Sequence, residues 1–321
     1  MKIPGDSDRI EGTMKSEALN FSVPASRSLP VWQTSAFLGA AFVLLWSTGY
    51  PAGKISLAHA APFTLLVLRF GFAGLIYFAL ALAARVPWPR GRDGLASALV
   101  GVFSLAMQFG GVYFAISLGA SAGMAALVIG TMPIATAMIG LAFNERIGRA
   151  QWIGFVLGIS GIALVVADRI GGGSAGIGAY MALIVGLAGI SVGTVLQKRF
   201  GSVVDLRSGL AIQHLVGTLL LLPFAWYEGF RADGSLSFAL SLGWLIAINS
   251  LAGFALLFVL LKRGATSQVA ALFFLMPPVT AVLNFFAVHE PLTVLKVVGF
   301  GLAALGVYLG THLATATSRA R

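Results

Sequence analysis

Long apolar runs separated by short polar stretches fill the chain after its first 34 residues. They are too long and continuous for outer-membrane strands, which are about 10 residues long and alternate in polarity. A helix needs about 20 apolar residues to cross a hydrocarbon core of ~30 Å. The pattern therefore predicts an all-α polytopic membrane protein of ten transmembrane helices, at 35–57, 62–84, 95–117, 121–143, 150–167, 177–197, 208–228, 238–260, 266–288 and 293–314.

The composition excludes a water-soluble enzyme. Of the residues, 58% are hydrophobic and 10% are charged, against about 25% charged in an ordinary soluble domain. The chain has no Cys, which excludes a disulfide-stapled secreted module. Residues 1–34 are polar and carry several Ser and Pro, so we interpret them as a disordered cytoplasmic tail, with a second cytoplasmic tail at 315–321.

Basic residues predict the orientation, because Lys and Arg concentrate in cytoplasmic loops. With the N-terminus inside, 16 of the 21 basic residues fall on the cytoplasmic side, and only Arg169, Arg231 and Lys296 fall outside. The remaining two, Lys54 and Arg69, lie within helices. We expect an inner-membrane protein with both termini cytoplasmic, whose net charge of +10 reflects topology and not a nucleic-acid partner.

The sequence repeats itself across two halves, 35–168 and 177–314. At an offset of 145, Pro133 matches Pro278 and Glu145 matches Glu290; at an offset of 144, Lys54 matches Lys198. Five helices in each half force the second copy into the membrane upside down. Such inverted repeats recur in secondary transporters, with the substrate site near mid-membrane between the copies.

The motifs resemble the EamA family of the drug/metabolite transporter superfamily. They are the segment from Trp46 to Lys54, Leu68-Arg69-Phe70, Asn144-Glu145-Arg146, Gln151-Trp152-Ile153-Gly154, Met276-Pro277-Pro278 and His289-Glu290-Pro291. Two departures are Asn144 and His289, since the family usually has Gly before this Glu. The resemblance implies ten helices and transport of small metabolites, often amino acids and often outward.

Four polar residues inside helices are the leading substrate-binding candidates: Lys54, Arg69, Gln213 and His214. Such groups are costly in a membrane and need a reason. Arg69 lies roughly 10 Å below the outer surface; it either meets a substrate carboxylate or plays a structural part. Lys54 is close enough to the outer end to extend to the interface instead. His214 either relays a proton or makes an interhelical hydrogen bond.

Three further groups complete the candidate site. Pro133, Pro277 and Pro278 interrupt helices in both halves, which either lines the cavity with backbone carbonyls or only kinks the helices. Trp46, Tyr50 and Tyr113 could enclose an apolar or aromatic substrate side chain, or simply pack in the core. Gln108, Asn249 and Asn284 could contact the substrate or bond between helices.

We therefore expect a secondary transporter, best described as an exporter of amino acids or related organic anions and zwitterions, that works by alternating access. No catalytic, metal or cofactor site is expected. The seven acids outside the tail fall in loops or at helix ends, which disfavours a membrane-embedded proton carrier. A sugar or nucleotide-sugar carrier, and an intramembrane transferase, are the alternatives. Glycine rows in helices five and ten indicate close packing or a homodimer interface.

Overall fold

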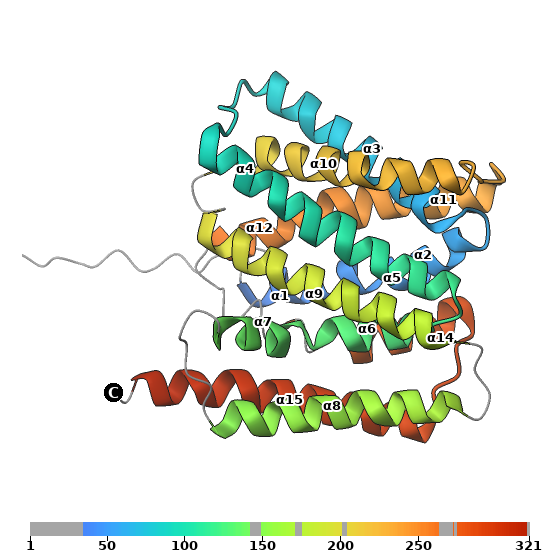
Figure 1. The fold of residues 1–321 in the computed structure, drawn as a ribbon, viewed down its shortest axis with the longest axis vertical. Helices are drawn as coiled ribbons and strands as arrows, with labels where there is room; N and C mark the ends of the chain where they lie inside the picture. The colour runs from blue at the N-terminus through green and yellow to red at the C-terminus, as the bar shows by residue number, and fades with distance from the viewer. Residues whose placement is uncertain are drawn as a thin grey trace, which may run out of the picture.

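The computed structural model describes residues 35–141, 149–170, 175–200, 204–262, 272 and 275–319. The described elements are helical, and helices run alongside one another as a bundle (Figure 1). In the first half they are α1 (Ser35–Ser47), α2 (Gly49–Leu57), α3 (Pro62–Ala83), α4 (Gly91–Val100), the π-helix η2 (Gly101–Met107), α5 (Gln108–Ser117), α6 (Ala122–Gly130), α7 (Met132–Leu141) and α8 (Arg149–Ile170).

The second half contains α9 (Ile177–Phe200), α10 (Leu206–Tyr227), α11 (Leu236–Trp244), the π-helix η3 (Leu245–Gly253), α12 (Phe254–Lys262), α14 (Met276–Val288) and α15 (Val294–Arg319). The predicted N-terminal tail lies outside the described residues, as do Asn144 and Glu145. The all-helical prediction is confirmed for the described part of the chain.

Six described helices are long and apolar enough to cross a membrane: Pro62–Ala83, Gly91–Ser117, Ala122–Ile139, Ile177–Arg199, Leu206–Tyr227 and Leu236–Leu260. Their outward faces carry large apolar side chains, including Phe72 and Leu75 on α3 and Leu219 on α10. A soluble bundle would place polar groups there. The exposed apolar surface identifies a polytopic membrane protein.

Helix starts follow local capping chemistry. The Ser121 hydroxyl accepts a hydrogen bond from the Met124 N–H at the start of α6, and the Asp205 carboxylate accepts one from the Arg207 N–H at the start of α10. Pro62 occupies the first turn of α3, where its missing N–H costs nothing. These caps satisfy donors that a helix cannot pair internally.

Three predicted helices are interrupted along their length. The first breaks at Thr48 between α1 and α2, and the fourth breaks at Thr131 between α6 and α7. In the ninth, α14 begins at Met276, directly before Pro277 and Pro278. The predicted interruptions next to prolines are therefore present, because Pro lacks the N–H that would continue the ladder.

The third and eighth predicted helices each contain a π-helical segment at an equivalent place, η2 and η3. The sequence pattern did not predict these π-helical segments. A π-helical turn is uncommon and often marks a functional site. Here η3 brings Asn249 and Ser250 into the interior, where both side chains are buried.

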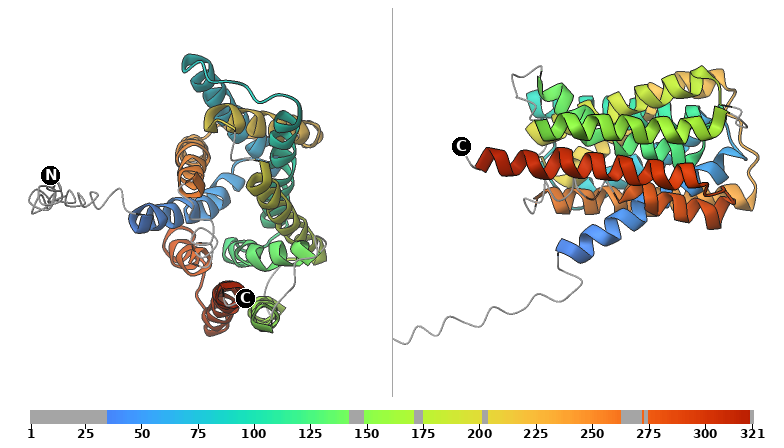
Figure 2. Two further views of the ribbon diagram at one scale, coloured as in Figure 1. Left: turned by 90° about the vertical axis from the view of Figure 1, so that its left-hand side faces the viewer. Right: turned by 90° about the horizontal axis from the view of Figure 1, so that it is seen from below.

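Helices of the first half pack in pairs against helices of the second half. Helix α3 lies along α10, and α8 lies along α15 at one edge of the bundle (Figure 2). The glycines of α8 and α15 make this second contact close: a β-carbon on Gly161 would lie 2.4 Å from the Gly299 carbonyl oxygen. The predicted close helix packing through glycine is thus made within one chain.

Candidate functional site

Arg69 is the buried cation at the middle of α3, with 2% of its surface exposed. Its Nε donates a hydrogen bond to the Ser250 Oγ at 2.9 Å, and its Nη1 donates to the Tyr113 hydroxyl at 2.9 Å. The guanidinium carbon lies 4.6 Å from the centre of the Phe109 ring. Three helical segments, α3, α5 and η3, therefore converge on one positive charge.

The charge of Arg69 has no carboxylate within 4.0 Å among the described residues. Two hydroxyls and aromatic faces stabilise it instead, and a cation over an aromatic ring gains about 0.5–2 kcal/mol. A buried charge without a counter-ion costs several kcal/mol. Chemically, this site favours a small anion, which would gain charge-assisted hydrogen bonds from the guanidinium.

Aromatic rings surround this cation. Tyr113, predicted from the sequence, is 3% exposed and lies against α2, where a β-carbon on Gly53 would be 2.6 Å from its hydroxyl. Trp46 is buried between Phe42 and Phe254, with ring centroids 5.3 and 5.1 Å away. Tyr50 is partly buried and packs against the same core. The structure thus places Tyr113 directly at Arg69, beside Phe70 and Phe109, whereas Trp46 is linked to this group through Phe254.

His214 and Gln213 are neighbours on α10 but point to different surroundings. The His214 side chain is fully buried, and its Nδ1 donates to the Leu210 carbonyl at 2.9 Å. Its Nε2 has no hydrogen-bond partner among the described residues. The ring meets Phe70 and Phe254 edge-on. His214 therefore borders the Arg69 site.

Gln213 instead donates from its Nε2 to the Gln197 Oε1 at 3.0 Å. Both amides line a small cavity near the ends of α4, α9 and α10, together with Ser97, Val204 and Phe258. The structure separates Gln213 from the Arg69 site. Sequence adjacency to His214 was a poor guide, because successive helical residues differ by about 100° around the axis.

Asn249 forms hydrogen bonds with backbone carbonyls near the break between α1 and α2. Its Nδ2 donates to the carbonyl oxygens of Leu45 at 2.7 Å and Trp46 at 3.3 Å. A β-carbon on Gly49 would lie 2.8 Å from this Nδ2, so only glycine leaves room for the amide. Gln108 is also buried, and its Oε1 has no partner.

A second charged cluster lies at the end of the bundle where α2 and α14 finish. Glu290 is 6% exposed and lies 4.0 Å from the Nζ of Lys54 and 4.0 Å from the Nζ of Lys296. Asn284 is 1% exposed, and neither its Oδ1 nor its Nδ2 has a hydrogen-bond partner in the part of the chain that the structure describes. Asn284, Glu290 and Lys296 line a small cavity.

Sequence reasoning did not find this cluster. Lys54 was interpreted as extending to the interface or binding substrate, and its pairing with Glu290 was not foreseen. Glu290 counted only as an acid at a helix end. The available signal was the repeat itself, which matches Glu290 with Glu145 and Lys54 with Lys198.

The prolines stand where helices break, as described above. Pro277 is buried, whereas Pro133 and Pro278 are partly buried. None of the three lines either of the two cavities described here. Their cavity-lining role stays a prediction.

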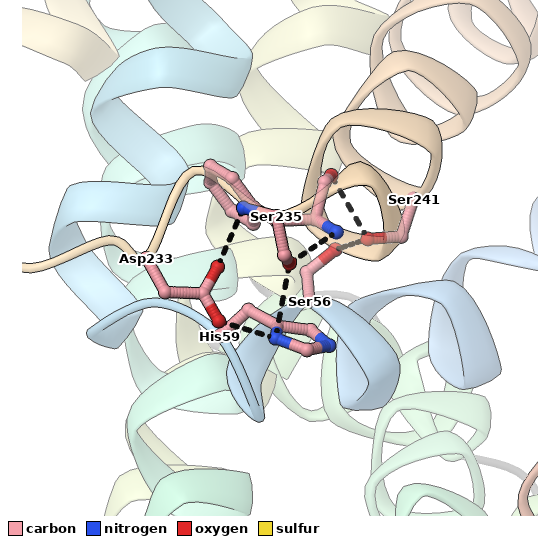
Figure 3. A network of polar contacts seen from close by, with 6 residues as sticks. Ser56, His59, Asp233, Ser235 and Ser241 are labelled. Atoms are coloured by element: carbon pink, nitrogen blue, oxygen red, sulfur yellow. Dashed lines mark hydrogen bonds and ion pairs between the residues drawn. The ribbon is translucent and has the colours of Figure 1, made fainter.

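A polar network joins the α2–α3 turn to the α10–α11 loop (Figure 3). The Asp233 Oδ2 lies 2.6 Å from the His59 Nδ1, and the Ser235 N–H donates to the Asp233 Oδ1 at 2.9 Å. The Ser56 hydroxyl donates to the Ser241 Oγ at 2.8 Å. The hydrogen bonds from Ser235 and His59 hold the pKa of the Asp233 carboxyl at about 2.

Among the described residues, no group of three His, Cys, Asp or Glu side chains could hold a metal ion. The candidate site is therefore defined by Arg69 and its hydroxyl and aromatic neighbours, with the Lys54–Glu290–Lys296 cluster one helix away. Of the residues predicted from sequence, Arg69, Tyr113, Trp46, Tyr50 and His214 are brought together.

Comparison with known proteins finds a transporter family and relatives that are named transporters. The profile of the EamA-like transporter family matches residues 33–167 and again 176–311. The chain is 28% identical over 293 residues to the uncharacterized transporter YvbV of Bacillus subtilis, covering 88% of this chain and 93% of that one. It is 25% identical over 285 residues to the uncharacterized inner membrane transporter YedA of Escherichia coli, covering 87% and 92%.

A third relative carries a functional name. The probable amino-acid metabolite efflux pump of Escherichia coli is 25% identical over 282 residues, covering 83% of this chain and 91% of that one. A solved structure titled "Crystal structure of protein" superposes with a TM-score of 0.64 at 22% identity, covering 88% of this chain and 98% of the other. That structure supports the fold alone.

Proposed function

The chain belongs to the EamA-like transporter family of the drug/metabolite transporter superfamily, and from this membership we propose that it exports amino acids or related organic anions and zwitterions. It is a membrane transporter and not an enzyme. The substrate crosses the inner membrane by alternating access, with the two halves moving around a site that contains Arg69.

We propose that the chain crosses the membrane ten times, as two inverted copies of one five-helix unit at 35–168 and 177–314, with both termini cytoplasmic. The paired packing of α3 with α10 and of α8 with α15 supports this arrangement. So do the matching positions of η2 and η3. The 16 basic residues on one side and three on the other support the orientation.

The observation that carries the substrate proposal is the buried charge of Arg69. Its guanidinium is held by Ser250 and Tyr113 and has no carboxylate counter-ion among the described residues. A substrate carboxylate supplies that missing charge. The rings of Phe70, Phe109 and Tyr113 around the guanidinium suit an apolar or aromatic side chain. The name of the amino-acid efflux relative agrees with this substrate class.

Substitution of Arg69 tests the proposal. In proteoliposomes, we expect the native chain to transport at least one labelled amino acid, with L-phenylalanine as the first probe. Arg69→Gln removes the charge and should reduce that transport at least tenfold, whereas Arg69→Lys should retain part of it. Arg231→Gln is the matched control, because Arg231 is exposed in the α10–α11 loop.

Two results would refute the substrate proposal. One is transport of sugars or nucleotide sugars, but of no amino acid or organic anion, by the native chain. The other is unchanged affinity and substrate preference in Arg69→Gln, since a guanidinium that binds the substrate carboxylate cannot be replaced by an uncharged amide without loss. Thermal unfolding of each variant in detergent separates loss of transport from loss of folding.

A further inference from the structure

The Lys54–Glu290 pair joins the two halves of the chain at one end of the bundle. Lys54 lies in α2 of the first half, and Glu290 lies between α14 and α15 of the second half. Their charged atoms are 4.0 Å apart, beyond hydrogen-bond length. The contact is therefore an ion pair without a direct hydrogen bond, and it is weaker than a bidentate pair.

The two lysines around Glu290 differ in how firmly they are held. The Lys296 side chain is 5% exposed, and its Nζ donates to the Pro291 carbonyl at 2.7 Å. The Lys54 side chain is 36% exposed, and Glu290 is its partner among the described residues. Because Lys54 is the more exposed of the two lysines, another anion can reach its ammonium group and replace Glu290 as its counter-ion.

Helix α2 connects this pair to the Arg69 site. Gly53, the residue before Lys54, packs directly against the hydroxyl of Tyr113, which accepts the hydrogen bond from Arg69. Helix α2 therefore carries both a contact with the Arg69 site, at Gly53, and the Lys54 side chain of the ion pair. The same helix also packs against α6 and α14, the helices that border Glu290 and its cavity.

We propose that Lys54 is a second residue that binds the substrate carboxylate, and that Glu290 is the resident counter-ion which this carboxylate displaces. The exchange frees α2 from the α14–α15 loop, so that this end of the bundle can open. The inference rests on the proposed function and assigns the residue that recognises the carboxylate during opening.

The charges explain why a carboxylate is required. When one carboxylate replaces another beside Lys54, the lysine stays neutralised, and Glu290 keeps Lys296 as its partner. A ligand without a carboxylate would separate Lys54 from Glu290 and give the Lys54 ammonium no replacement counter-ion. Asn284, whose amide has no partner and which lines the same cavity, can hydrogen-bond the released Glu290.

Opposite effects on the KM for L-phenylalanine transport test the exchange. Glu290→Gln removes the competing carboxylate, so we expect the KM to fall severalfold. Lys54→Gln removes the binding charge, so we expect the KM to rise severalfold. A purely structural ion pair would move both variants in the same direction. Lys198→Gln is the matched control, since Lys198 is the repeat counterpart of Lys54 and is exposed at the other end.

A labelling experiment keeps the native ion pair intact. Because the chain contains no Cys, Ala281→Cys introduces a single thiol. Ala281 is 5% exposed and lines the cavity beside Glu290. In right-side-out vesicles, L-phenylalanine should accelerate labelling by a membrane-impermeant maleimide, and phenylalaninamide, which lacks the carboxylate, should not.

The inference is overturned if Glu290→Gln and Lys54→Gln shift the KM in the same direction, or if the amide accelerates labelling as much as the amino acid. These results are distinct from failure of the proposed function. That failure would appear in the native chain as an absence of amino-acid transport, before any substitution at Lys54 or Glu290 is made.

Discussion

Gly53→Ala is a test of how tightly the Arg69 site is built. An added β-carbon would lie 2.6 Å from the Tyr113 hydroxyl oxygen and 2.8 Å from its Cζ atom. Normal contact needs about 3.4 Å or more, so either the phenol or α2 must move by roughly 0.8 Å. Tyr113 is 3% exposed and bonded to Arg69, so it has little free space to move into.

The expected energy follows from these contacts. Overpacking a filled interior costs about 1–3 kcal/mol. Replacing a helical glycine by alanine stabilises the folded state by about 1 kcal/mol, because alanine has the higher helix propensity. Displacing the phenol also weakens a hydrogen bond to a charged group, worth about 1.5–3 kcal/mol. We expect a net loss of folding stability of about 1–3 kcal/mol. Because a displaced Tyr113 also displaces Arg69, we expect the KM for L-phenylalanine to rise about tenfold, which corresponds to ~1.4 kcal/mol of binding free energy.

The assay compares Gly53→Ala with Gly71→Ala. On α3, a β-carbon at Gly71 would meet only the Thr218 Cγ2 at 3.7 Å, an ordinary contact. Gly71→Ala should therefore leave both the KM and the thermal unfolding midpoint unchanged or slightly improved. If Gly53→Ala behaves like this control in both measurements, the tight contact between α2 and Tyr113 does not shape the site, and the reasoning fails.

Three further substitutions probe other parts of the fold. Gly161→Ala places a β-carbon 2.4 Å from the Gly299 carbonyl oxygen; the unfolding midpoint should fall well below that of Gly301→Ala, where nothing lies within 4 Å. Asn249→Leu removes the amide that donates to the Leu45 and Trp46 carbonyls and should cost about 1–3 kcal/mol in a denaturant titration; an unchanged titration would contradict this. Asp233→Asn should lower the unfolding midpoint at pH 7, because a carboxyl with a folded-state pKa of about 2 stabilises the chain above its unfolded value of about 3.9. That difference should shrink as the pH falls through this window, and a constant difference would count against the His59–Asp233 contact.

The Lys54–Glu290–Lys296 cluster shows that a site can be missed when each segment of the sequence is interpreted separately. Each residue has a plain local interpretation: a lysine near a helix end extends outward, and a glutamate before a proline ends a helix. Their contact joins residues far apart in sequence. Only the packing of α2 against α14 decides it. The same holds for His59 and Asp233, which are 174 residues apart.

The sequence by itself determined the membrane class and the all-helical fold of the described residues, and it predicted a repeat of five-helix units. Apolar length fixes a helix that must satisfy its own backbone in lipid, and Pro133 and Pro277 mark breaks because proline cannot continue the hydrogen-bond ladder. Counting along one such helix also put Arg69 deep in the bundle. Only the tertiary structure decided which partners Arg69 meets and that Gln213 faces another cavity. Side-chain contacts depend on how helices rotate and pack against one another, and the apolar pattern of one helix does not specify that rotation.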